Sequence, residues 1–293
     1  MVSVKGRSII VWFLLPALLI YTLFTIAPLA GTVAMSFTDW PGFAGAPLKF
    51  NGLANYQRLF ADAEFWRSMT NLIQFVVVSV AIHIPVGLLL ATLLSNIARG
   101  YRFFRTSFFM PFVMPLTAVS LLWCIILLPN DQGLLNAILN SVGLGAAAHG
   151  WLIEPGIAMI SLAMVNGWVS TGFFTTILFA GIMQIPQSIT ESAILDGAGP
   201  IKRFATITMP LLRPVIGTCL ILDLTGSIKV FDLVFVMTKG GPNGLTQLPT
   251  TYMYDEAFKN HHFGVGSAAA VAIIVLSLIA TILSVRLVKD ESN

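Results

Sequence analysis

Long stretches of apolar residues follow one another along this chain, separated by short polar segments. Six stretches approach or exceed the roughly 20 residues that an α-helix needs to cross a bilayer. They lie at about 9–35, 70–95, 107–128, 157–183, 209–236 and 264–288. Because hydrocarbon offers the backbone no hydrogen-bond partners, we expect each stretch to be a helix. The pattern predicts an all-α, polytopic membrane protein with six transmembrane helices.

Two features within these stretches predict departures from plain helices. Pro111 and Pro115 fall inside the third stretch, where proline removes a helical hydrogen bond and kinks the helix. The fifth stretch is the least apolar of the six. Its Lys229 and Asp232 stand three positions apart, on one helical face, and we expect them to form an internal ion pair.

Composition agrees with a membrane protein and narrows its chemistry. Hydrophobic residues make up 56% of the 293 residues and charged residues only 10%, against about 25% in soluble domains. The basic residues are spread over the inter-helix segments, so the net charge of +3 indicates no nucleic-acid partner. Cys124 and Cys219 lie inside apolar stretches, as buried free thiols do. No spacing typical of a metal site or of a cofactor site stands out, so we expect neither.

The distribution of lysine and arginine predicts how the chain is oriented. With the N-terminus inside, ten basic residues fall on cytoplasmic segments and five on outer segments, although the outer ones are longer. The positive-inside rule then places both termini in the cytoplasm. The first apolar stretch, 9–35, is too long for the core of a signal peptide, so we expect an uncleaved helix.

The cytoplasmic segment 184–214 has the pattern of a helix–turn–helix. Ser188, followed three residues later by Glu191, fits a capping box at the start of a helix. Gly197 can take the left-handed conformation that ends this helix. Pro200 suits the first turn of a second helix. The segment is therefore expected to project from the cytoplasmic side of the bundle, and on these signals alone it could be a plain structured connector.

This segment resembles the EAA loop of the permeases of binding-protein-dependent ABC importers. The family pattern is Glu-Ala-Ala, three residues, Gly, and later Ile-x-Leu-Pro. It stands here as Glu191, Ser192, Ala193, Gly197, Ile207, Met209 and Pro210, with Ser192 for Ala and Met209 for Leu as mild departures. The resemblance implies that the loop docks on an ATPase subunit. The coupling residues that it implies are Glu191, Ser192, Ala193, Asp196, Gly197 and Ala198.

The resemblance extends over nearly the whole chain and narrows to the carbohydrate-type permeases, similar to the maltose permease MalF. It rests on residues 36–40, 52–56, 133–136, 151, 168, 231–232 and 238–242. The resemblance implies the MetI-like ABC-importer permease fold in a single transmembrane domain over 1–293. A peripheral first helix would span 9–35, and a five-helix core would span 70–288 with the coupling loop at 184–214.

The family also implies a function and partners. The chain would be the permease subunit of an ATP-driven sugar importer in the bacterial cytoplasmic (inner) membrane. It would form a heterodimer with a second permease, and would work with two ATP-binding cassette subunits and an extracytoplasmic solute-binding protein. The chain contains no P-loop, so ATP hydrolysis belongs to a separate subunit and the chain itself is not an enzyme.

Polar residues inside the apolar stretches are candidates for the sugar path, because burying them against lipid is costly. Asn166, Ser170 and Phe173 share one face of the fourth stretch. Asp223 and Ser227 share a face of the fifth stretch. Together they offer hydrogen bonds and an aromatic surface for a sugar ring, and they match sugar-contacting positions of the maltose-type permeases. The alternative is that they form hydrogen bonds between helices.

Three other functions have to be weighed against a sugar permease. The same architecture could carry a phosphorylated polyol such as glycerol 3-phosphate, although the charge of Asp223 argues against an anionic solute. An ion-coupled secondary transporter could also bury charged residues, but it would not need the cytoplasmic helix–turn–helix. An intramembrane hydrolase would need a catalytic constellation that the apolar stretches do not assemble. His83, isolated in the second stretch, is expected to make an interhelical contact rather than to relay protons.

Overall fold

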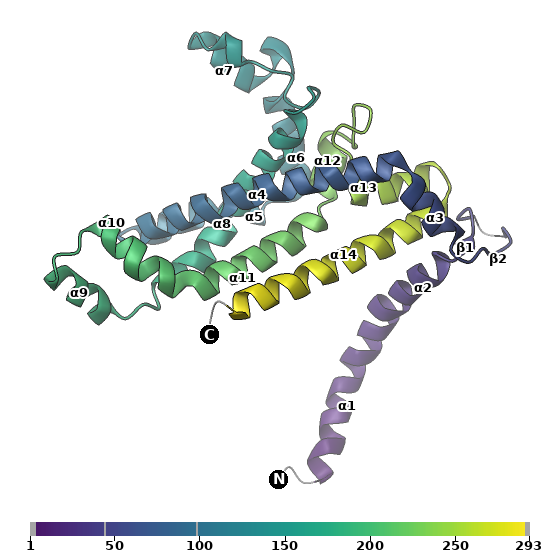
Figure 1. Cartoon of the computed structure of the whole chain (residues 1–293), viewed down its shortest axis with the longest axis horizontal. Coiled ribbons are helices and arrows are strands. Elements are labelled where there is room, and N and C mark those ends of the chain that lie inside the picture. Colours follow the sequence, from purple (N-terminus) through teal and green to yellow (C-terminus); the bar gives the residue numbers. More distant parts are fainter. Residues whose placement is uncertain (1–3, 44, 98, 291–293) are drawn as a thin grey trace. The chain divides into compact units, whose positions relative to one another are not determined.

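The computed structural model describes residues 4–43, 45–97 and 99–290 (Figure 1). Among these residues, five helical stretches are long and apolar enough to cross a membrane, and a bent helix pair brings the number to six if it is counted as one span. The five lie at Phe13–Met35, Ala63–Ser95, Ala158–Ile182, Pro200–Ile228 and Phe263–Arg286, and the pair at Tyr101–Val113 and Leu116–Ile126. The prediction of a helical, polytopic chain is confirmed.

By its internal contacts the chain divides into two compact units. The first consists of residues 1–65 and 252–274, and the second of residues 66–251 and 275–293. The first unit contains α1 (Val4–Tyr21), a π-helical turn (Thr22–Ile26), α2 (Ala27–Met35), β1 (Thr38–Asp39), β2 (Lys49–Phe50), α3 (Ala54–Ala61), a second π-helical turn (Asp255–Lys259) and the start of α14 (Phe263–Asp290).

A small antiparallel ribbon follows α2, and the sequence analysis did not predict it. Thr38 pairs with Phe50, and Asp39 with Lys49. The buried side chain of Asn55 in α3 donates hydrogen bonds of 2.9 Å to the carbonyl oxygens of Ser36 and Thr38. One amide therefore fixes the entry to this ribbon.

The second unit carries most of the membrane-spanning helices. Its elements are α4 (Ala63–Ser95, from residue 66), α5 (Tyr101–Val113), α6 (Leu116–Ile126), α7 (Leu134–Ser141), α8 (Ala158–Ile182), α9 (Gln187–Leu195), α10 (Pro200–Arg203), α11 (Met209–Ile228), α12 (Asp232–Met237) and α13 (Pro249–Tyr254). Short 3-10 turns lie at Asn130–Gln132 and Gly145–Ala147, and a π-helical turn at Phe204–Thr208 leads into α11.

Helix α8 is the centre of this unit, and glycines let its neighbours approach closely. A side-chain carbon at Gly172 would lie 1.9 Å from the carbonyl oxygen of Phe108 in α5. At Gly167 it would lie 2.8 Å from the side chain of Ile82 in α4. The backbones can meet at these points only because glycine is there, as is common where membrane helices pack. Toward its C-terminal end α8 packs through Leu178 against buried side chains of α4 and α11.

The third predicted helix is not a single helix. It is divided into α5 and α6, which are bent by 93°. Met114 between them is extended (φ −69°, ψ 147°), because the ring of Pro115 disfavours the helical conformation of the residue before it. Pro115 therefore breaks the span, whereas Pro111 remains inside α5.

The fifth predicted helix ends earlier than expected. Helix α11 stops at Ile228 rather than near 236, and the chain turns before α12 begins. The predicted ion pair between Lys229 and Asp232 is wrong: both residues are exposed, and neither has an ion-pair partner in the described part of the chain. The turn between α11 and α12 interrupts the helix that would have put the two residues on one face. The expected free thiols are confirmed at Cys124 and Cys219.

Candidate functional site

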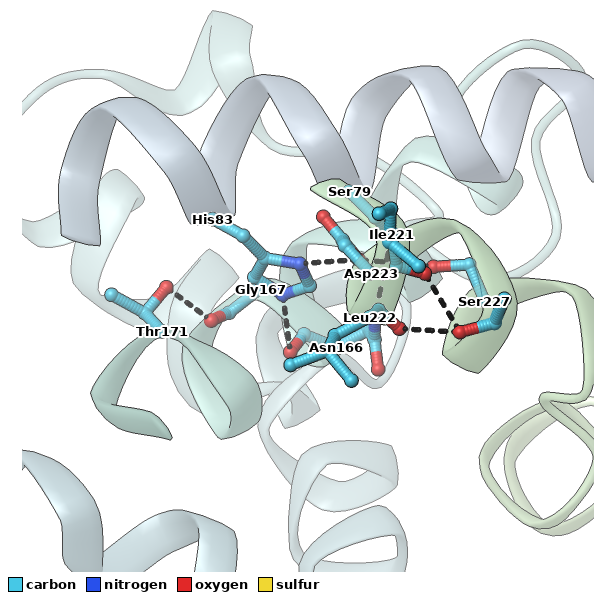
Figure 2. A network of polar contacts seen from close by, with 10 residues as sticks. Ser79, His83, Asn166, Gly167, Thr171, Ile221, Leu222, Asp223 and Ser227 are labelled. Carbon is cyan, nitrogen blue, oxygen red and sulfur yellow. Dashed lines mark hydrogen bonds and ion pairs between the residues drawn. The ribbon is translucent and has the colours of Figure 1, made fainter. Parts of the chain in front are cut away.

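A buried polar network joins three helices of the second unit (Figure 2). His83 of α4 is 1% exposed and Asp223 of α11 is 3% exposed. The ring nitrogen Nδ1 of His83 lies 2.9 Å from Oδ1 of Asp223, and Nε2 lies 3.3 Å from the main-chain oxygen of Asn166 in α8. His83 thus connects α4, α8 and α11 through one side chain.

Further contacts hold the two members of the pair. Ser227, one turn after Asp223, donates its hydroxyl to the same Oδ1 at 3.2 Å. The ring of Phe174 stacks on the imidazole of His83 with the centroids 4.9 Å apart. The second carboxylate oxygen, Oδ2 of Asp223, is buried and has no hydrogen-bond partner among the described residues. Buried polar atoms of this kind are rare in folded proteins and call for a partner.

The structure brings together three of the five predicted path residues. Asp223 and Ser227 are bonded to each other, and Asn166 joins them through His83. The half-buried amide of Asn166 also donates to Ser79 Oγ at 3.3 Å. A sugar path through these groups remains a prediction, because the same bonds hold helices together.

The other two predicted path residues lie outside this network. Ser170 is half-buried, and its hydroxyl makes no hydrogen bond within the described chain. Phe173 stacks on Phe112 of α5 with the centroids 4.7 Å apart, and meets Phe174 edge to face. Its ring therefore already has apolar partners inside the unit.

Ser79 and His83 were not among the predicted site residues, although His83 was expected to contact another helix. The signal was present in the sequence. The two residues stand four positions apart in an otherwise apolar stretch, so they share one helix face, as Asp223 and Ser227 do. When two different spans each carry a pair of polar residues four positions apart, the pattern indicates that the two polar faces pack against each other.

The segment 184–214 folds as a helix–turn–helix, as predicted. Helix α9 ends at Leu195, and Gly197 is left-handed with φ +75°. The main-chain N–H of Ala198 donates to the carbonyl oxygen of Ala193, and that of Gly197 to the carbonyl oxygen of Ile194. These two bonds form a Schellman motif, which closes the end of a helix. Pro200 then begins α10.

The predicted capping box is wrong. The N-cap residue of α9 is Pro186, and no side chain caps this end. Glu191 instead accepts a 2.7 Å hydrogen bond from the Gln187 amide, one turn earlier on the exposed side of α9. Because proline already turns the chain into the helix at 186, Ser188 lies inside the first turn.

The helix–turn–helix exposes large apolar side chains around Gly197. Leu195 is 88% exposed, Ile201 is 85% exposed and Ile194 is 53% exposed. Of the residues that the resemblance singled out, Ala193 is buried, while Glu191 and Gly197 are exposed. The family pattern therefore missed the apolar part of this surface, which we call the coupling face: Glu191, Ile194, Leu195, Gly197 and Ile201.

A groove of about 590 Å³ with a mixed polar and apolar lining lies beside the same segment. The ends of α4 and α8 form one side of it, with Asn96 and Gln184, and the coupling segment forms the other, with Thr190 and Arg203. The segment is thus separated from the bundle over part of its length.

On the first unit, polar groups order the segments that connect the helices. Tyr252 is 2% exposed and donates its hydroxyl to Oδ2 of Asp62 at 2.7 Å. Burial, and then the hydrogen bond to Asp62, raise the pKa of Tyr252 well above its ordinary value. Glu256 accepts bonds from Asn260 at 2.6 Å and from the ring of His262 at 3.0 Å. These bonds fix the chain before α14.

Comparisons with known proteins agree with this architecture. Residues 83–292 match the family described as binding-protein-dependent transport system inner membrane component. The probable ABC transporter permease YurN of Bacillus subtilis is 34% identical over 280 residues, 94% of each chain. The trehalose/maltose transport system permease MalF of Thermococcus litoralis is 34% identical over 274 residues, which are 93% of this chain and 91% of that protein.

A solved structure shows the same fold. The bacterial ABC transporter that imports the acidic polysaccharide alginate contains a chain with a TM-score of 0.84 at 22% identity, covering 98% of this chain and 97% of that one. The MetI-like permease fold implied by the coupling loop is therefore confirmed. With its spans, its helix–turn–helix at 184–214 and a family match over most of its length, this chain belongs to the inner-membrane components of binding-protein-dependent transport systems.

Proposed function

We propose that this chain is the membrane-spanning permease subunit of an ATP-driven importer for a sugar. The observation that carries the proposal is the coupling face. Its Leu195 and Ile201 are almost fully exposed on either side of the left-handed turn at Gly197. Large apolar side chains gathered on a helix–turn–helix are typical of a surface that another protein covers. We infer that an ATPase subunit covers it and moves it when ATP binds.

The proposal of a sugar substrate rests on the substrates named for similar proteins rather than on any single residue of this chain. The Thermococcus litoralis relative is named for trehalose and maltose, and the structural neighbour imports a polysaccharide. These names favour a sugar over glycerol 3-phosphate. The presence of Asp223 does not by itself exclude an anionic solute, because Nδ1 of His83 lies 2.9 Å from its carboxylate oxygen Oδ1. An ion-coupled secondary transporter is not favoured, since the family works with binding proteins.

The remaining assignments follow from this role. A second permease would complete the translocation path, and an extracytoplasmic binding protein would deliver the solute. Both termini would lie in the cytoplasm. The family match begins only at residue 83, which supports a core near 70–288 and a peripheral first helix at 9–35.

We assign the sugar path to the polar centre around Asn166, Asp223 and Ser227, with Ser170 and Phe173 on the same side of α8. The half-buried Asn166 and Ser170 stand four positions apart, one turn of α8. Asp223 and Ser227 are buried in the structure, so the solute would reach them only in another conformation of the transport cycle. Asn166→Ala should therefore weaken sugar uptake per complex several-fold, because it removes the contribution of about one hydrogen bond to the binding free energy of the sugar.

The test is to purify the tagged chain from its native membrane in mild detergent. The proposal predicts that a second permease and ATPase subunits are recovered with it. The purified complex is then assayed with labelled maltose, trehalose and glycerol 3-phosphate. Uptake of a sugar supports the proposal. A chain recovered alone, with transport activity of its own, would contradict it.

A further inference from the structure

The buried pair of His83 and Asp223 is isolated from other charges. In α4, no other acidic or basic residue occurs between Ser68 and Ser95, and α8 contains none at all. In α11, the other ionisable groups are Arg213, nearly three turns away, and the thiol of Cys219, one turn away; Lys229, the C-cap residue six positions after Asp223, is exposed. The charge state of this centre is therefore decided by the two members of the pair.

The hydrogen bonds of His83 determine how many protons the pair holds. The main-chain oxygen of Asn166 can only accept, so Nε2 of His83 carries a hydrogen. Nδ1 lies 2.9 Å from Asp223 Oδ1, and a hydrogen bond there needs one more proton. That proton belongs either to an imidazolium facing a carboxylate or to a carboxylic acid facing a neutral imidazole. The pair is electrically neutral in both cases.

Both donors that reach Asp223 bind the same oxygen. His83 and Ser227 converge on Oδ1, while Oδ2 is buried without a partner among the described residues. An oxygen of a neutralised carboxylate suits a hydroxyl donor. A cation bound there would leave an uncompensated charge in a medium of low dielectric constant.

We propose that His83 is a specificity-determining residue: by sharing a proton with Asp223 it keeps this centre neutral, so that the free Oδ2 accepts a hydrogen bond from an uncharged, hydroxyl-bearing solute. The inference rests on the proposed function, because it describes how the sugar path would distinguish uncharged from charged solutes. His83 acts through Asp223 and is a positioning residue, which gives it a role beyond that of an interhelical contact.

Three variants of matched shape separate charge from packing. In His83→Asn the amide can replace Nδ1 as the donor to Asp223, but it brings no proton that can be shared. Asp223→Asn leaves a neutral centre, and the double variant His83→Asn/Asp223→Asn leaves a neutral centre without any ionisable group. Each is assayed as the complete importer with its binding protein in proteoliposomes, at pH 6 and pH 8.5. The probe is maltose or trehalose, whichever the wild type imports.

The inference predicts that net charge decides uptake. At pH 8.5, His83→Asn should raise the KM for the sugar about ten-fold or more, since an uncompensated buried carboxylate opposes a neutral solute. Asp223→Asn and the double variant should stay within about three-fold of the wild type at both pH values. The double variant also serves as the control for any effect of pH on the other subunits.

The results that would contradict the inference can be told apart from those that would contradict the proposed function. If His83→Asn transports like the wild type at pH 8.5, the charge of Asp223 needs no compensation and the inference fails. If the double variant is as impaired as His83→Asn, the exact side chains matter rather than the charge, and the inference also fails. Lower abundance or melting temperature with an unchanged KM would show that the pair only holds helices together. A wild-type complex that imports no sugar would instead contradict the proposed function.

Discussion

Ala198 donates its main-chain N–H to the carbonyl oxygen of Ala193 across 2.9 Å, and this bond turns the chain at the end of α9. Gly197 between them makes the turn possible because it is left-handed, with φ +75°. No atom lies within 4 Å of the place where its side chain would begin. The space next to Gly197 is thus open within this chain, as a docking surface requires.

A substitution series at Gly197 tests whether a partner occupies that space. Asparagine tolerates the left-handed conformation far better than alanine does, so Gly197→Asn should preserve the turn, while Gly197→Ala should cost about 1 kcal/mol. If an ATPase subunit packs against Gly197, both variants should reduce its recovery with the purified chain. If only the backbone conformation matters, Gly197→Asn should recover the ATPase like the wild type, and the close contact at this position would be refuted.

The exposed apolar side chains of the coupling face should be essential although they are not in the family pattern. Leu195→Ser and Ile201→Ser remove side chains that are 88% and 85% exposed, so neither should lower the melting temperature of the membrane bundle. Buried at an interface, each apolar side chain contributes about 1.5–3 kcal/mol. We expect each variant to weaken ATPase binding about ten-fold or more.

The matched control for this pair is Phe103→Ser in α5, which removes a side chain that is 72% exposed and lies outside the coupling face. It should leave ATPase binding within about two-fold of the wild type. The measurement is the ATPase retained by each variant at equal membrane abundance. Normal retention in both Leu195→Ser and Ile201→Ser would show that this surface faces solvent in the working complex.

Glu191 should matter through its charge rather than through its helix. Its bond to Gln187 lies on an exposed side of α9 and contributes little to stability. Glu191→Lys should therefore uncouple ATP hydrolysis from uptake without unfolding the chain, if the docking groove is basic. Gln187→Ala, which removes the same hydrogen bond but keeps the carboxylate, is the control and should transport normally. Equal defects in the two variants would assign Glu191 a purely local role.

The close approach of α5 and α8 predicts a position at which even alanine is not tolerated. Gly172→Ala would bring a carbon to 1.9 Å from the carbonyl oxygen of Phe108, so the two backbones must separate. Overpacking of this kind costs typically about 1–3 kcal/mol. We expect a lower melting temperature and lower membrane abundance. Gly226→Ala in α11 meets no atom within 4 Å and should be neutral or stabilising. Equal stability of both variants would contradict the helix packing.

The sequence predicted the spans because apolar length is a local property. What it could not predict depends on neighbours. Helix α4 begins at residue 63, earlier than the apolar pattern indicated, because a mixed polar and apolar segment before the apolar stretch continues the same helix. The break at Pro115 was read as a kink, since proline patterns alone do not distinguish a bend from a break of 93°.

Only part of the candidate site could be predicted, again because the sequence shows local patterns but not contacts between distant residues. Residues of one helix face, such as Asp223 and Ser227, follow from helical periodicity. The contact between His83 and Asp223 joins positions 140 residues apart, and no local rule pairs them. Likewise the turn at Gly197 was predictable from glycine, whereas the exposure of Leu195 and Ile201 depends on which sides of the segment the bundle covers.

The most direct test of the account is uptake by the purified complex in proteoliposomes. Maltose or trehalose and the binding protein are supplied outside, and ATP is enclosed with the ATPase subunits. The account predicts sugar accumulation that requires both the enclosed ATP and the binding protein, and that persists when an uncoupler removes ion gradients. Accumulation that continues without ATP and stops when the ion gradient is removed would contradict it.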